Sequence, residues 1–333
     1  MNESLGLTSF KHQADMLANR VKKRFSHFYK RFSRQQIDVF RLYDWDIPEI
    51  RAVVDWYGGH LVVGEYMRRQ SVPEWLPAMG QAVAEVLGVP PERLHLKQRW
   101  AGPRDGKRYE RIDYTDQKIV LRERDLRFWV NPHDYVDTGL FADHRNTRQM
   151  VRDMAAGKDV LNLFGYTASF SCYAAKGGAR RTVSVDRSET ATRWAAENFS
   201  LNTIDPAENR LVHSHTADYL QRARREGQRF DLAVVDPPSY SVTQTRNESF
   251  DIFKDHPRLL AAVITLLRPS ATLFFSTNHQ RFTFDQDGLI RCLADFPESA
   301  PTISKVEEIT QRTIPEDYQH KRKTIHRCWQ ITV

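Results

Sequence analysis

Residues 159–188 read DVLNLFGYTASFSCYAAKGGARRTVSVDRS, and this stretch decides the fold class. An apolar run breaks at Gly165, small residues follow, and an alanine-rich segment then reaches Gly177 and Gly178. A second run, rich in β-branched residues, ends on Asp186, about 20 residues beyond the turn. This order predicts a β-turn-α-β unit in which a carboxylate can hold the hydroxyls of a ribose. Because the stretch lies in the middle of the chain, we expect a further module before it.

Strand-like and helix-like segments alternate from about residue 131 onward. The expected strands are 160–164, 181–186, 210–213, 231–236 and 271–277, with two more near 302–310 and 324–332. The expected helices are 168–177, 188–201, 216–226, 251–267 and 284–294. This alternation predicts an α/β fold with a Rossmann-like, doubly wound sheet, mostly parallel and with an antiparallel final strand. We expect residues 131–333 to form this domain.

The N-terminal segment, residues 1–35, has the pattern of a basic amphipathic helix. No Gly or Pro occurs between residues 7 and 34, and apolar residues recur every three or four positions from Leu17 to Phe32. The opposite face is basic and carries Lys22, Lys23, Arg24, Lys30, Arg31 and Arg34. Two interpretations stay open: a solvated helix docked on the body of the protein, or a helix whose basic face contacts phosphates.

Residues 36–130 have the pattern of a small α+β domain. The expected elements are a strand within 37–46, a hairpin around Gly58-Gly59, a helix at 74–87 and strands at 93–100, 111–115 and 118–124. The loop 101–109 and its flanks interleave basic residues with Trp100 and Tyr109. Because this mixture suits phosphate neutralisation and base stacking, we expect an RNA-binding site with Arg99, Arg104, Lys107, Arg108 and Arg111. A solvated hairpin tip is the alternative.

Composition and charge narrow the class of protein. At 333 residues and 41% hydrophobic content, the chain can bury two cores. Its net charge is +7, and residues 1–130 hold 23 Lys and Arg against 17 Asp and Glu, so the basic excess lies in the first third. This asymmetry favours a polyanionic partner. Three scattered cysteines predict neither a zinc site nor disulfides, and no metal is expected. Without an apolar run of membrane-spanning length or a signal-peptide pattern, we expect a cytoplasmic protein with no membrane partner.

The turn after the first strand of this unit lacks the G-x-G-x-x-G fingerprint of dinucleotide-binding folds. Gly165 stands alone, and Ala168 takes the place of a second glycine. Less room is then left for a pyrophosphate, which argues against NAD or FAD and favours a nucleoside without phosphates. Its ribose would bind Asp186, unless this carboxylate simply ends a strand.

The tetrapeptide Pro237-Pro238-Ser239-Tyr240 follows a strand that ends with Asp236. Ligands of open α/β sheets bind at the carboxyl ends of the strands, so this loop should lie at the site. The prolines stiffen the loop, and a flat base can lie against Pro238 and Tyr240 while the Asp236 carboxylate accepts its N–H groups. A plain turn is the alternative.

Three further residues are candidates. Asp218 stands at the start of an expected helix, where it can either cap that helix or hold an adenine amino group. Asp143 and Arg145 lie just before the nucleotide unit, and Arg145 can clamp a carboxylate. A surface helix start is the alternative for this second pair.

These motifs resemble the class I S-adenosylmethionine-dependent methyltransferases, and more narrowly the large-subunit rRNA methyltransferases. The resemblance rests on DVLNLFGYTASF (159–170), VSVD (183–186), DPPSY (236–240) and YVDTGLFADHR (135–145). Segments outside any generic cofactor motif extend it over nearly the whole chain: 40–57, 60–66, 307–318 and 325–333. The pattern is similar to the guanine-N7 half of the bifunctional 23S rRNA guanine methyltransferases, here as a free-standing form.

The resemblance implies S-adenosylmethionine as cofactor, S-adenosylhomocysteine as product and 23S rRNA, or a large-subunit assembly intermediate, as partner. The implied cofactor-binding residues are Asp143 and Arg145 near the methionine end, Asn162, Phe164, Gly165, Tyr166, Thr167 and Ala168 beneath the methionine and sulfonium, Asp186 at the ribose, Arg187, Ser188 and Asp218 around the adenine, and Asp236. The implied catalytic residues are Asp236, Pro237, Pro238 and Tyr240. These enzymes commonly have glycine where this chain has Ala168, and the added methyl group is expected to reduce the space in the cofactor pocket.

The target atom is narrowed by the chemistry of methyl transfer. Methylation of cytosine C5 needs a thiolate, yet no cysteine follows the expected strand 271–277. Guanine N7 has an exposed lone pair and needs only orientation, whereas an exocyclic amine must also lose a proton. The residues leave these two targets open, and the whole-chain resemblance favours N7. A small-molecule or protein methyltransferase and a non-enzymatic RNA-binding assembly factor are the other classes considered.

Overall fold

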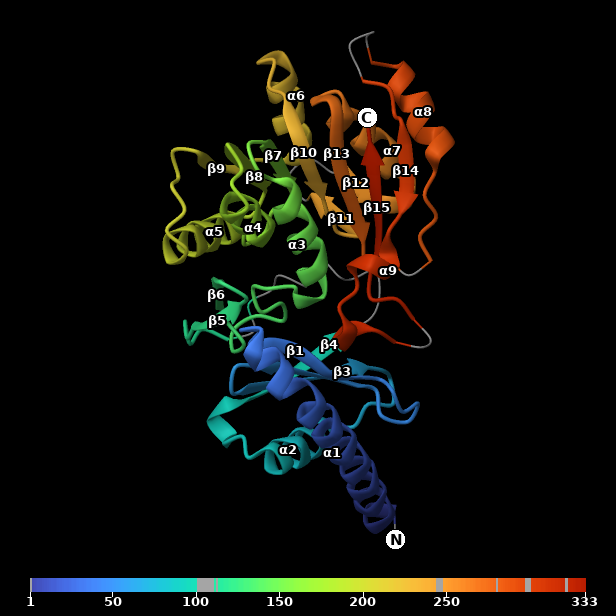
Figure 1. Ribbon diagram of the computed structural model, residues 1–333. Coiled ribbons are helices and arrows are strands. Elements are labelled where there is room, and N and C mark those ends of the chain that lie inside the picture. Colours follow the sequence, from blue (N-terminus) through green and yellow to red (C-terminus); the bar gives the residue numbers. More distant parts are fainter. Residues whose placement is uncertain are drawn as a thin grey trace. The chain divides into compact units, whose positions relative to one another are not determined.

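Figure 1 shows the computed structural model of the chain. The structure describes residues 2–100, 111, 113–243, 248–279, 281–296, 301–320 and 323–333, and within them only the backbone of 2–9, 100, 240–243, 248 and 249. The chain divides into two compact units. Unit 1 comprises Met1–Ala142 with Glu316–His320, and unit 2 comprises Asp143–Pro315 with Lys321–Val333. The expected division into three stretches with boundaries at 35 and 130 stays a prediction.

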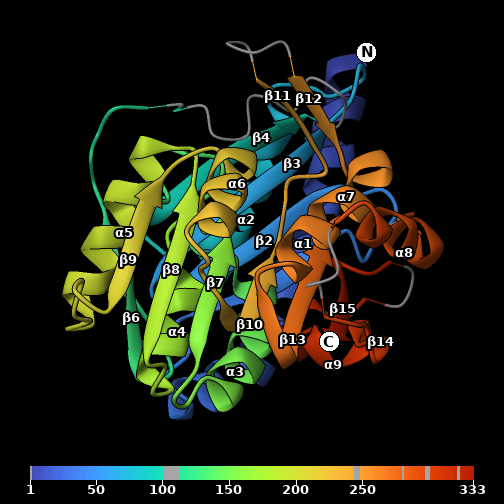
Figure 2. The same ribbon diagram turned by 90° about the horizontal axis from the view of Figure 1, so that it is seen from above.

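Unit 2 contains a seven-stranded sheet in the order β14-β15-β13-β10-β7-β8-β9. Its strands are β7 (Asp159–Leu163), β8 (Arg181–Asp186), β9 (Asn209–His213), β10 (Phe230–Val235), β13 (Leu267–Thr277), β14 (Lys305–Glu308) and β15 (Arg327–Thr332). The five neighbouring strands β13, β10, β7, β8 and β9 run parallel to one another, and β15 runs antiparallel to β13 and β14 (Figure 2). The predicted Rossmann-like sheet with its antiparallel final strand is confirmed.

Helices cover both faces of this sheet. They are α3 (Arg145–Met154), α4 (Ser169–Lys176), α5 (Glu189–Leu201), α6 (Thr216–Arg225), α7 (Ile252–Ile264), α8 (Gln286–Ala294) and the short α9 (Thr310–Thr313). Apolar side chains of α6, α7 and α8 share one core cluster with the sheet, while those of α3 and α4 share another. The predicted doubly wound arrangement follows from these two layers.

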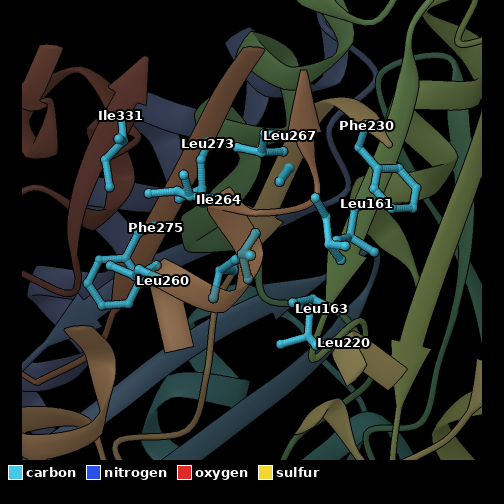
Figure 3. Close-up of a cluster of buried hydrophobic side chains, with 14 of the residues drawn as sticks. Leu161, Leu163, Leu220, Phe230, Leu260, Ile264, Leu267, Leu273, Phe275 and Ile331 are labelled. Atoms are coloured by element: carbon cyan, nitrogen blue, oxygen red, sulfur yellow. The ribbon is translucent and has the colours of Figure 1, made fainter. Parts of the chain in front are cut away.

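The alternation of side chains along β7 explains how one strand serves both layers. Leu161 and Leu163 are fully buried in the cluster that also contains Leu220 of α6 and Leu260 of α7, and Figure 3 shows Leu163 beside Leu220. Val160 points to the opposite face and belongs to the cluster with α3 and α4. Each such leucine contributes roughly 1.5–3 kcal/mol by leaving water. The strand is therefore fixed in register, and its last residues lie at a defined edge.

Unit 1 contains a four-stranded sheet in the order β1-β2-β3-β4, and the helices α1 and α2. The elements are α1 (Asn2–Arg34), β1 (Val39–Asp44), β2 (Ala52–Tyr57), β3 (His60–Met67), α2 (Trp75–Leu87), the 3-10 turn η1 (Pro91–Arg93) and β4 (Leu94–Trp100). The hairpin β2–β3 turns at Gly58 and Gly59, whose φ angles of 55° and 103° suit glycine. Strand β4 runs parallel to β3, and α2 supplies the crossover that a parallel pair requires.

The long helix α1 docks on unit 1 through its apolar stripe. Leu17, Val21, Phe28 and Phe32 are at most 4% exposed and share a cluster with the sheet and α2, so the docked interpretation is confirmed for this face. On the basic face, Lys22, Lys23, Lys30 and Arg34 are exposed. Phosphate contact by these four side chains stays a prediction.

The segment Glu316–His320 belongs to unit 1 because it binds a buried arginine there. Arg41 is 6% exposed, and its guanidinium binds Asp55 through two hydrogen bonds of 2.8 and 3.0 Å. Its backbone N–H donates to the Asp317 carboxylate over 3.1 Å, and its guanidinium lies 4.6 Å from the centre of the Tyr318 ring. Arg24 also donates to the Asp317 carbonyl, at 2.9 Å.

Three sequence expectations about the elements are wrong in detail. No strand forms over 113–118, and Arg111 makes only an isolated bridge to Tyr135, because its guanidinium and Asp134 organise this region through side chains. Strand β5 (Ile119–Glu123) pairs instead with an unexpected strand β6 (Leu126–Val130). The segment after Ser239, expected as loop, forms a second hairpin from β11 (Tyr240–Thr243) and β12 (Glu248–Asp251). The first helix, Asn2–Arg34, agrees with the expected helical segment 1–35.

Over the ranges that the structure describes, no helix combines the length and the apolar character needed to cross a membrane.

Candidate active site at the carboxyl edge of the sheet

The turn after β7 holds a backbone that L-residues rarely adopt. Phe164, Tyr166 and Ala168 have φ angles of 55°, 48° and 58°, so alternate residues lie in the left-handed region. Hydrogen bonds hold the turn in place: the Gly165 N–H donates to the Val185 carbonyl over 2.9 Å, and the Ala168 N–H donates to the Gly165 carbonyl over 2.7 Å. Strain of this kind persists only where the surroundings enforce it, and it gathers at ligand sites.

Gly165 is required by close packing beneath the turn. A Cβ at this position would lie 3.3 Å from both the Asn162 side-chain nitrogen and the Ser184 Cβ. Asn162 is 2% exposed and donates to the Ser171 hydroxyl of α4 over 3.1 Å, and that hydroxyl lies 2.5 Å from the Ser184 hydroxyl. The Asn162 amide therefore supports the turn from below.

Ala168 ends the turn and is the N-cap residue of α4. It is fully buried, with φ 58° and ψ 30°. Glycine adopts this conformation without the clash that a Cβ introduces, which explains why a glycine is expected here. The neighbouring Thr167 is 1% exposed, and its carbonyl accepts a 3.0 Å hydrogen bond from the Asn198 side chain. Thr167 therefore contributes backbone to the turn.

Asp186, at the end of β8, faces this turn. Its Oδ2 accepts the Tyr166 N–H at 2.9 Å and its Oδ1 accepts the Ser188 N–H at 2.8 Å. Each carboxylate oxygen keeps a lone pair for a further donor, which is what the two hydroxyls of a ribose need. Burial raises the pKa of Asp186, and the two N–H groups oppose that shift. The carboxylate thus fits the ribose of a nucleoside cofactor.

The predicted adenine-flanking residues lie around the ends of β8 and β9. Arg187 is exposed, and its carbonyl lies 3.0 Å from the His213 Nε2. Ser188 caps α5, because its hydroxyl accepts the Ala191 N–H at 3.2 Å. Asp218 is half-buried in the first turn of α6, and His215, which occupies the N-cap position, makes no side-chain cap, so capping by Asp218 stays open. An adenine contact by Asp218 stays a prediction.

Asp236 follows β10, which is the neighbour of β7 in the sheet. Its Oδ1 accepts a 2.6 Å hydrogen bond from the Ser276 hydroxyl of β13. Its Oδ2 lies 3.5 Å from the His144 Nε2. Pro237 is buried and Pro238 is half-buried. Tyr240 opens β11, and its side chain lies outside the described part, so its predicted role stays a prediction.

A buried histidine pair lies beside Asp236, and sequence reasoning missed its role. His144 and His326 are 6% and 1% exposed, and their rings stack 4.3 Å apart with an interplanar angle of 11°. Asp143 Oδ2 lies 3.2 Å from the His326 Nδ1, and the Thr313 hydroxyl lies 3.0 Å from its Nε2. Only the presence of His144 and His326 inside the motifs at 135–145 and 325–333 hinted at them.

Burial decides the protonation of His144. Burial lowers the pKa of His144, although the Asp236 carboxylate opposes that shift. The buried Nδ1 has no hydrogen-bond partner, while Nε2 faces Asp236 at 3.5 Å and Asp143 at 3.8 Å. The neutral tautomer with its proton on Nε2 is therefore favoured, because it directs N–H towards two carboxylates. The Ser276 hydroxyl orients Asp236 through its 2.6 Å hydrogen bond, and the His144 Nε2 lies 3.5 Å from the other carboxylate oxygen.

The start of α3 is not a surface feature. Arg145 is 2% exposed, so the surface-helix alternative is wrong for this segment. Arg148, one turn later, is fully buried and its guanidinium lies 5.9 Å from the centre of the Phe170 ring. The carboxylate clamp suggested for Arg145 stays a prediction.

The cysteines need one correction. The sequence places Cys328 away from the carboxyl ends of the strands, but β15 pairs it with Ser276, the residue that binds Asp236. The Cys328 thiol is fully buried, and burial raises its pKa, as it does for Cys172 in α4. Neither thiol forms a thiolate at neutral pH, so the argument against a thiolate nucleophile holds for a different reason.

The predicted RNA-binding residues belong to the sequence range of unit 1. Arg104, Lys107 and Arg108 lie outside the described residues. Arg111 forms an ion pair with Asp134 at 3.0 Å, and Arg99 is half-buried. RNA contact by this group stays a prediction.

The residues at this edge match the needs of a nucleoside with a reactive methyl group. Asn162 is the next-to-last residue of β7, Asp186 ends β8 and Asp236 follows β10. These strands are neighbours in the sheet, so their parallel carboxyl ends meet at one edge. One carboxylate is arranged for a diol, and a second is held at the stiff Pro237-Pro238 segment. S-adenosylmethionine, if bound there, would supply an electrophilic methyl group.

Comparison with known proteins agrees with this geometry. A family model for S-adenosylmethionine-dependent methyltransferases matches residues 48–316. The chain is 40% identical to the Ribosomal RNA large subunit methyltransferase K of Neisseria meningitidis, over 94% of this chain and 86% of the relative. It is 39% identical to the methyltransferase K/L of Magnetococcus marinus over 96% of this chain, but spans only 43% of that longer relative.

Solved structures share the fold. One from Streptococcus mutans, assigned as an S-adenosylmethionine-dependent methyltransferase, has a TM-score of 0.74 and 24% identity over 96% of this chain and 81% of its own. The S-adenosylmethionine-dependent methyltransferase of Agrobacterium tumefaciens has a TM-score of 0.59 and 20% identity over 85% and 87% of the two chains. At these identities the likeness establishes the fold alone. By the family model and the 40% identical relative, this chain belongs to the S-adenosylmethionine-dependent methyltransferase family.

Proposed function

We propose that the chain transfers the methyl group of S-adenosylmethionine to guanine N7 in large-subunit (23S) rRNA. The observation that carries the base assignment is the Asp236 carboxylate, held by Ser276 beside the Pro237-Pro238 segment at the carboxyl edge. The rRNA substrate is supported by the relative from Neisseria meningitidis, which is named for it.

The geometry of Asp236 suits a guanine that is bound but not deprotonated. A carboxylate has only acceptors, and the Watson–Crick edge of guanine offers N1–H and the N2 amine as donors. Binding that edge leaves N7, on the opposite side of the purine, free to meet the methyl group. Since N7 loses no proton, orientation in a closed pocket supplies the catalysis, an effect of up to about 7–11 kcal/mol.

Methylation of an exocyclic amine is the competing function. The Asp236 carboxylate accepts N–H groups equally well from the amine that reacts, and His144 beside it could then take part in proton removal. The two functions differ in their product: N7-methylguanine is positively charged, whereas N2-methylguanine is neutral. Chemical cleavage specific to N7-methylguanine separates them directly.

We propose that unit 1 binds the RNA. The exposed lysines of α1 and the segment from Arg99 to Arg111 carry the basic excess of the first third. If they neutralise phosphates, the affinity for RNA must fall steeply as salt rises. A target guanine that is paired must also be extruded, which costs a few kcal/mol. An rRNA substrate goes with a cytoplasmic location, which we include in the proposal.

Mapping of modified bases in 23S rRNA tests the proposal. A strain that lacks the gene should lose N7-methylguanine at one position, and the intact gene should restore it. Unchanged N7-methylguanine at every position would exclude the proposed target. Loss of N2-methylguanine instead would establish the competing function, and salt-independent substrate binding would favour a small-molecule or protein substrate.

A further inference from the structure

Unit 1 brings together three histidines that are far apart in the sequence. His60 begins β3, His95 lies in β4 and His133 follows β6. One ring nitrogen of each lies within 4.8 Å of those of the other two. We propose that His60, His95 and His133 form a binding site for a divalent transition-metal ion, with zinc as the best match. This site is independent of the methyl-transfer function.

The distances between the rings fit a shared ion. Zinc binds imidazole nitrogens at about 2.0–2.1 Å in tetrahedral geometry, which places two ligand nitrogens about 3.3 Å apart and their ring centres about 5 Å apart. The His60 Nδ1 and His95 Nε2 are 3.1 Å apart, and their ring centres are 5.3 Å apart. The His133 ring meets His95 edge-on at 77°, with 4.3 Å between centres, so a rotation of this half-buried side chain completes the set.

A second group of possible metal ligands is arranged in a way that does not suit metal binding. Among the described residues, Asp143, His144 and His326 also lie within 4.8 Å of one another. Their two rings stack in parallel at 4.3 Å, and both nitrogens of His326 already face partners, Asp143 and Thr313. Hydrogen bonds account for that cluster, so the metal proposal is confined to unit 1.

The scaffold around the three histidines is well ordered by polar contacts. His95 is 6% exposed on a strand whose register is fixed opposite Val62 of β3. The His133 N–H donates to the Asn131 side chain at 3.0 Å, and its carbonyl accepts a 2.7 Å hydrogen bond from the Lys97 ammonium. Ligands held on such a frame lose little freedom when they bind a metal.

Burial and the neighbouring charges affect both the protonation of the histidines and the affinity of the site for a cation. Burial lowers the pKa of His60, and it lowers the pKa of His95 to about 3, with Arg93 and Lys97 adding to these shifts respectively. Both rings are therefore neutral at pH 7, the form that binds metal. The same two cations repel a metal ion, but the Lys97 ammonium is directed at the His133 carbonyl. Three imidazole ligands favour zinc over the hard ions magnesium and calcium.

Titration of the full-length, chelator-treated protein with zinc chloride tests the proposal. Isothermal calorimetry at pH 7.5 should show one equivalent bound, and His60→Ala should weaken binding at least tenfold. Zinc at a hundredfold excess over its dissociation constant should raise the Tm of the wild type by about 5 °C or more. His95→Ala should show the same loss, and half-buried His60 remains informative if that core variant does not fold.

Matched variants distinguish the competing outcomes. His12→Ala, at an exposed position of α1, should bind zinc like the wild type. Zinc binding that is lost in His326→Ala but kept in His60→Ala would overturn the proposal, because the ion would then occupy the cluster in unit 2. An absence of saturable binding would also overturn it, and would leave a neutral hydrogen bond between His60 and His95 as the reason for their 3.1 Å approach.

Discussion

The two edges of the seven-stranded sheet use aspartates in opposite ways. At the carboxyl edge, the recorded partners of Asp186 are backbone N–H groups, and Asp236 has the Ser276 hydroxyl and His144. At the amino edge, Asp159 is 1% exposed and forms ion pairs with Arg180, Arg181 and Arg268 at 2.5–3.1 Å. Carboxylates at the first edge keep lone pairs for a ligand, whereas Asp159 is saturated by arginine.

The pKa shifts follow this difference. Burial raises the pKa of Asp186 because two N–H groups do not offset the loss of water. Burial acts in the same direction on Asp159, but hydrogen bonds from Arg180 and Arg268 outweigh it and the pKa is lowered. A hollow of about 470 Å³ lies at the amino edge. Of its lining residues, Arg268 pairs with Asp231, and Arg180 and Arg268 pair with Asp159. The chemistry of the residues, and not the size of the hollow, therefore locates the ligand site.

Asp236→Ala should have the largest effect on function. Loss of the base-orienting carboxylate should lower single-turnover methyl transfer at least 100-fold, since orientation dominates an N7 reaction. The affinity for S-adenosylhomocysteine, measured by calorimetry, should change less than threefold by comparison. Equal losses in turnover and cofactor affinity would refute the role assigned to Asp236.

Asp186→Ala should impair cofactor binding instead. Two charge-assisted hydrogen bonds to the ribose account for about 2–4 kcal/mol, so the Kd for S-adenosylhomocysteine should rise roughly 30- to 1,000-fold. RNA affinity, measured by filter binding at fixed salt, should stay at the wild-type value. A Kd within a factor of three of wild type would show that the ribose binds elsewhere.

Asp159→Asn should lower stability and spare function. Removing a buried carboxylate leaves three arginines without their partner, but these are 36–59% exposed in their side chains. We therefore expect a loss of about 1–3 kcal/mol in the free energy of unfolding, below the cost at a fully buried pair. Urea unfolding provides the measurement, and turnover at 20 °C should equal that of wild type. A fall in cofactor affinity would contradict the division between the two edges.

The contribution of Asp159 to the free energy of unfolding should decrease as the pH falls. Because its pKa is lower in the folded state, its stabilisation is fully present above the unfolded value of about 3.9 and is lost as pH falls through the folded value. The difference in unfolding free energy between wild type and Asp159→Asn should thus be constant from pH 5 to 7 and shrink below about pH 4. A difference that grows on acidification would contradict the ion-pair account.

Ala168→Gly should have the smallest effect. The change relieves a left-handed φ of 58° but removes a buried methyl group and adds freedom to the unfolded chain. Because each term is worth about 1 kcal/mol, the unfolding free energy should change by less than about 1 kcal/mol. Ala174→Gly, a buried position within α4, gains no such relief and should cost more. Equal losses in the two variants would show that Ala168 is not strained.

The elements that could be predicted from the sequence are those with a periodic pattern of apolar residues. The alternation of strand-like and helix-like segments along 159–186 and the single Gly165 predicted the sheet, the turn and the location of Asp186. These features depend on local backbone preferences. The hairpin β11–β12 was missed because residues 240–251 contain no Gly, no Pro and no dipeptide such as Asn-Gly that marks a tight hairpin.

Contacts between distant residues could not be predicted. His326 reaches Asp143 across 183 positions, and Ser276 reaches Asp236 across 40, so no local pattern reveals either pair. Cys328 was placed wrongly for the same reason, because only the pairing of β15 with β13 brings it beside Ser276. The histidines of unit 1 likewise meet only through the β3–β4 register and the segment after β6.

Methyl transfer in vitro tests the central claim most directly. Labelled S-adenosylmethionine would be incubated with 23S rRNA from a strain that lacks the gene, and the product cleaved at N7-methylguanine. Wild type and Asp159→Asn should label one guanine at N7, and Asp236→Ala should label it at least 100-fold more slowly. Label absent from the RNA with wild type, or transferred equally by Asp236→Ala, would contradict the assignment of the carboxyl edge as the methyl-transfer site.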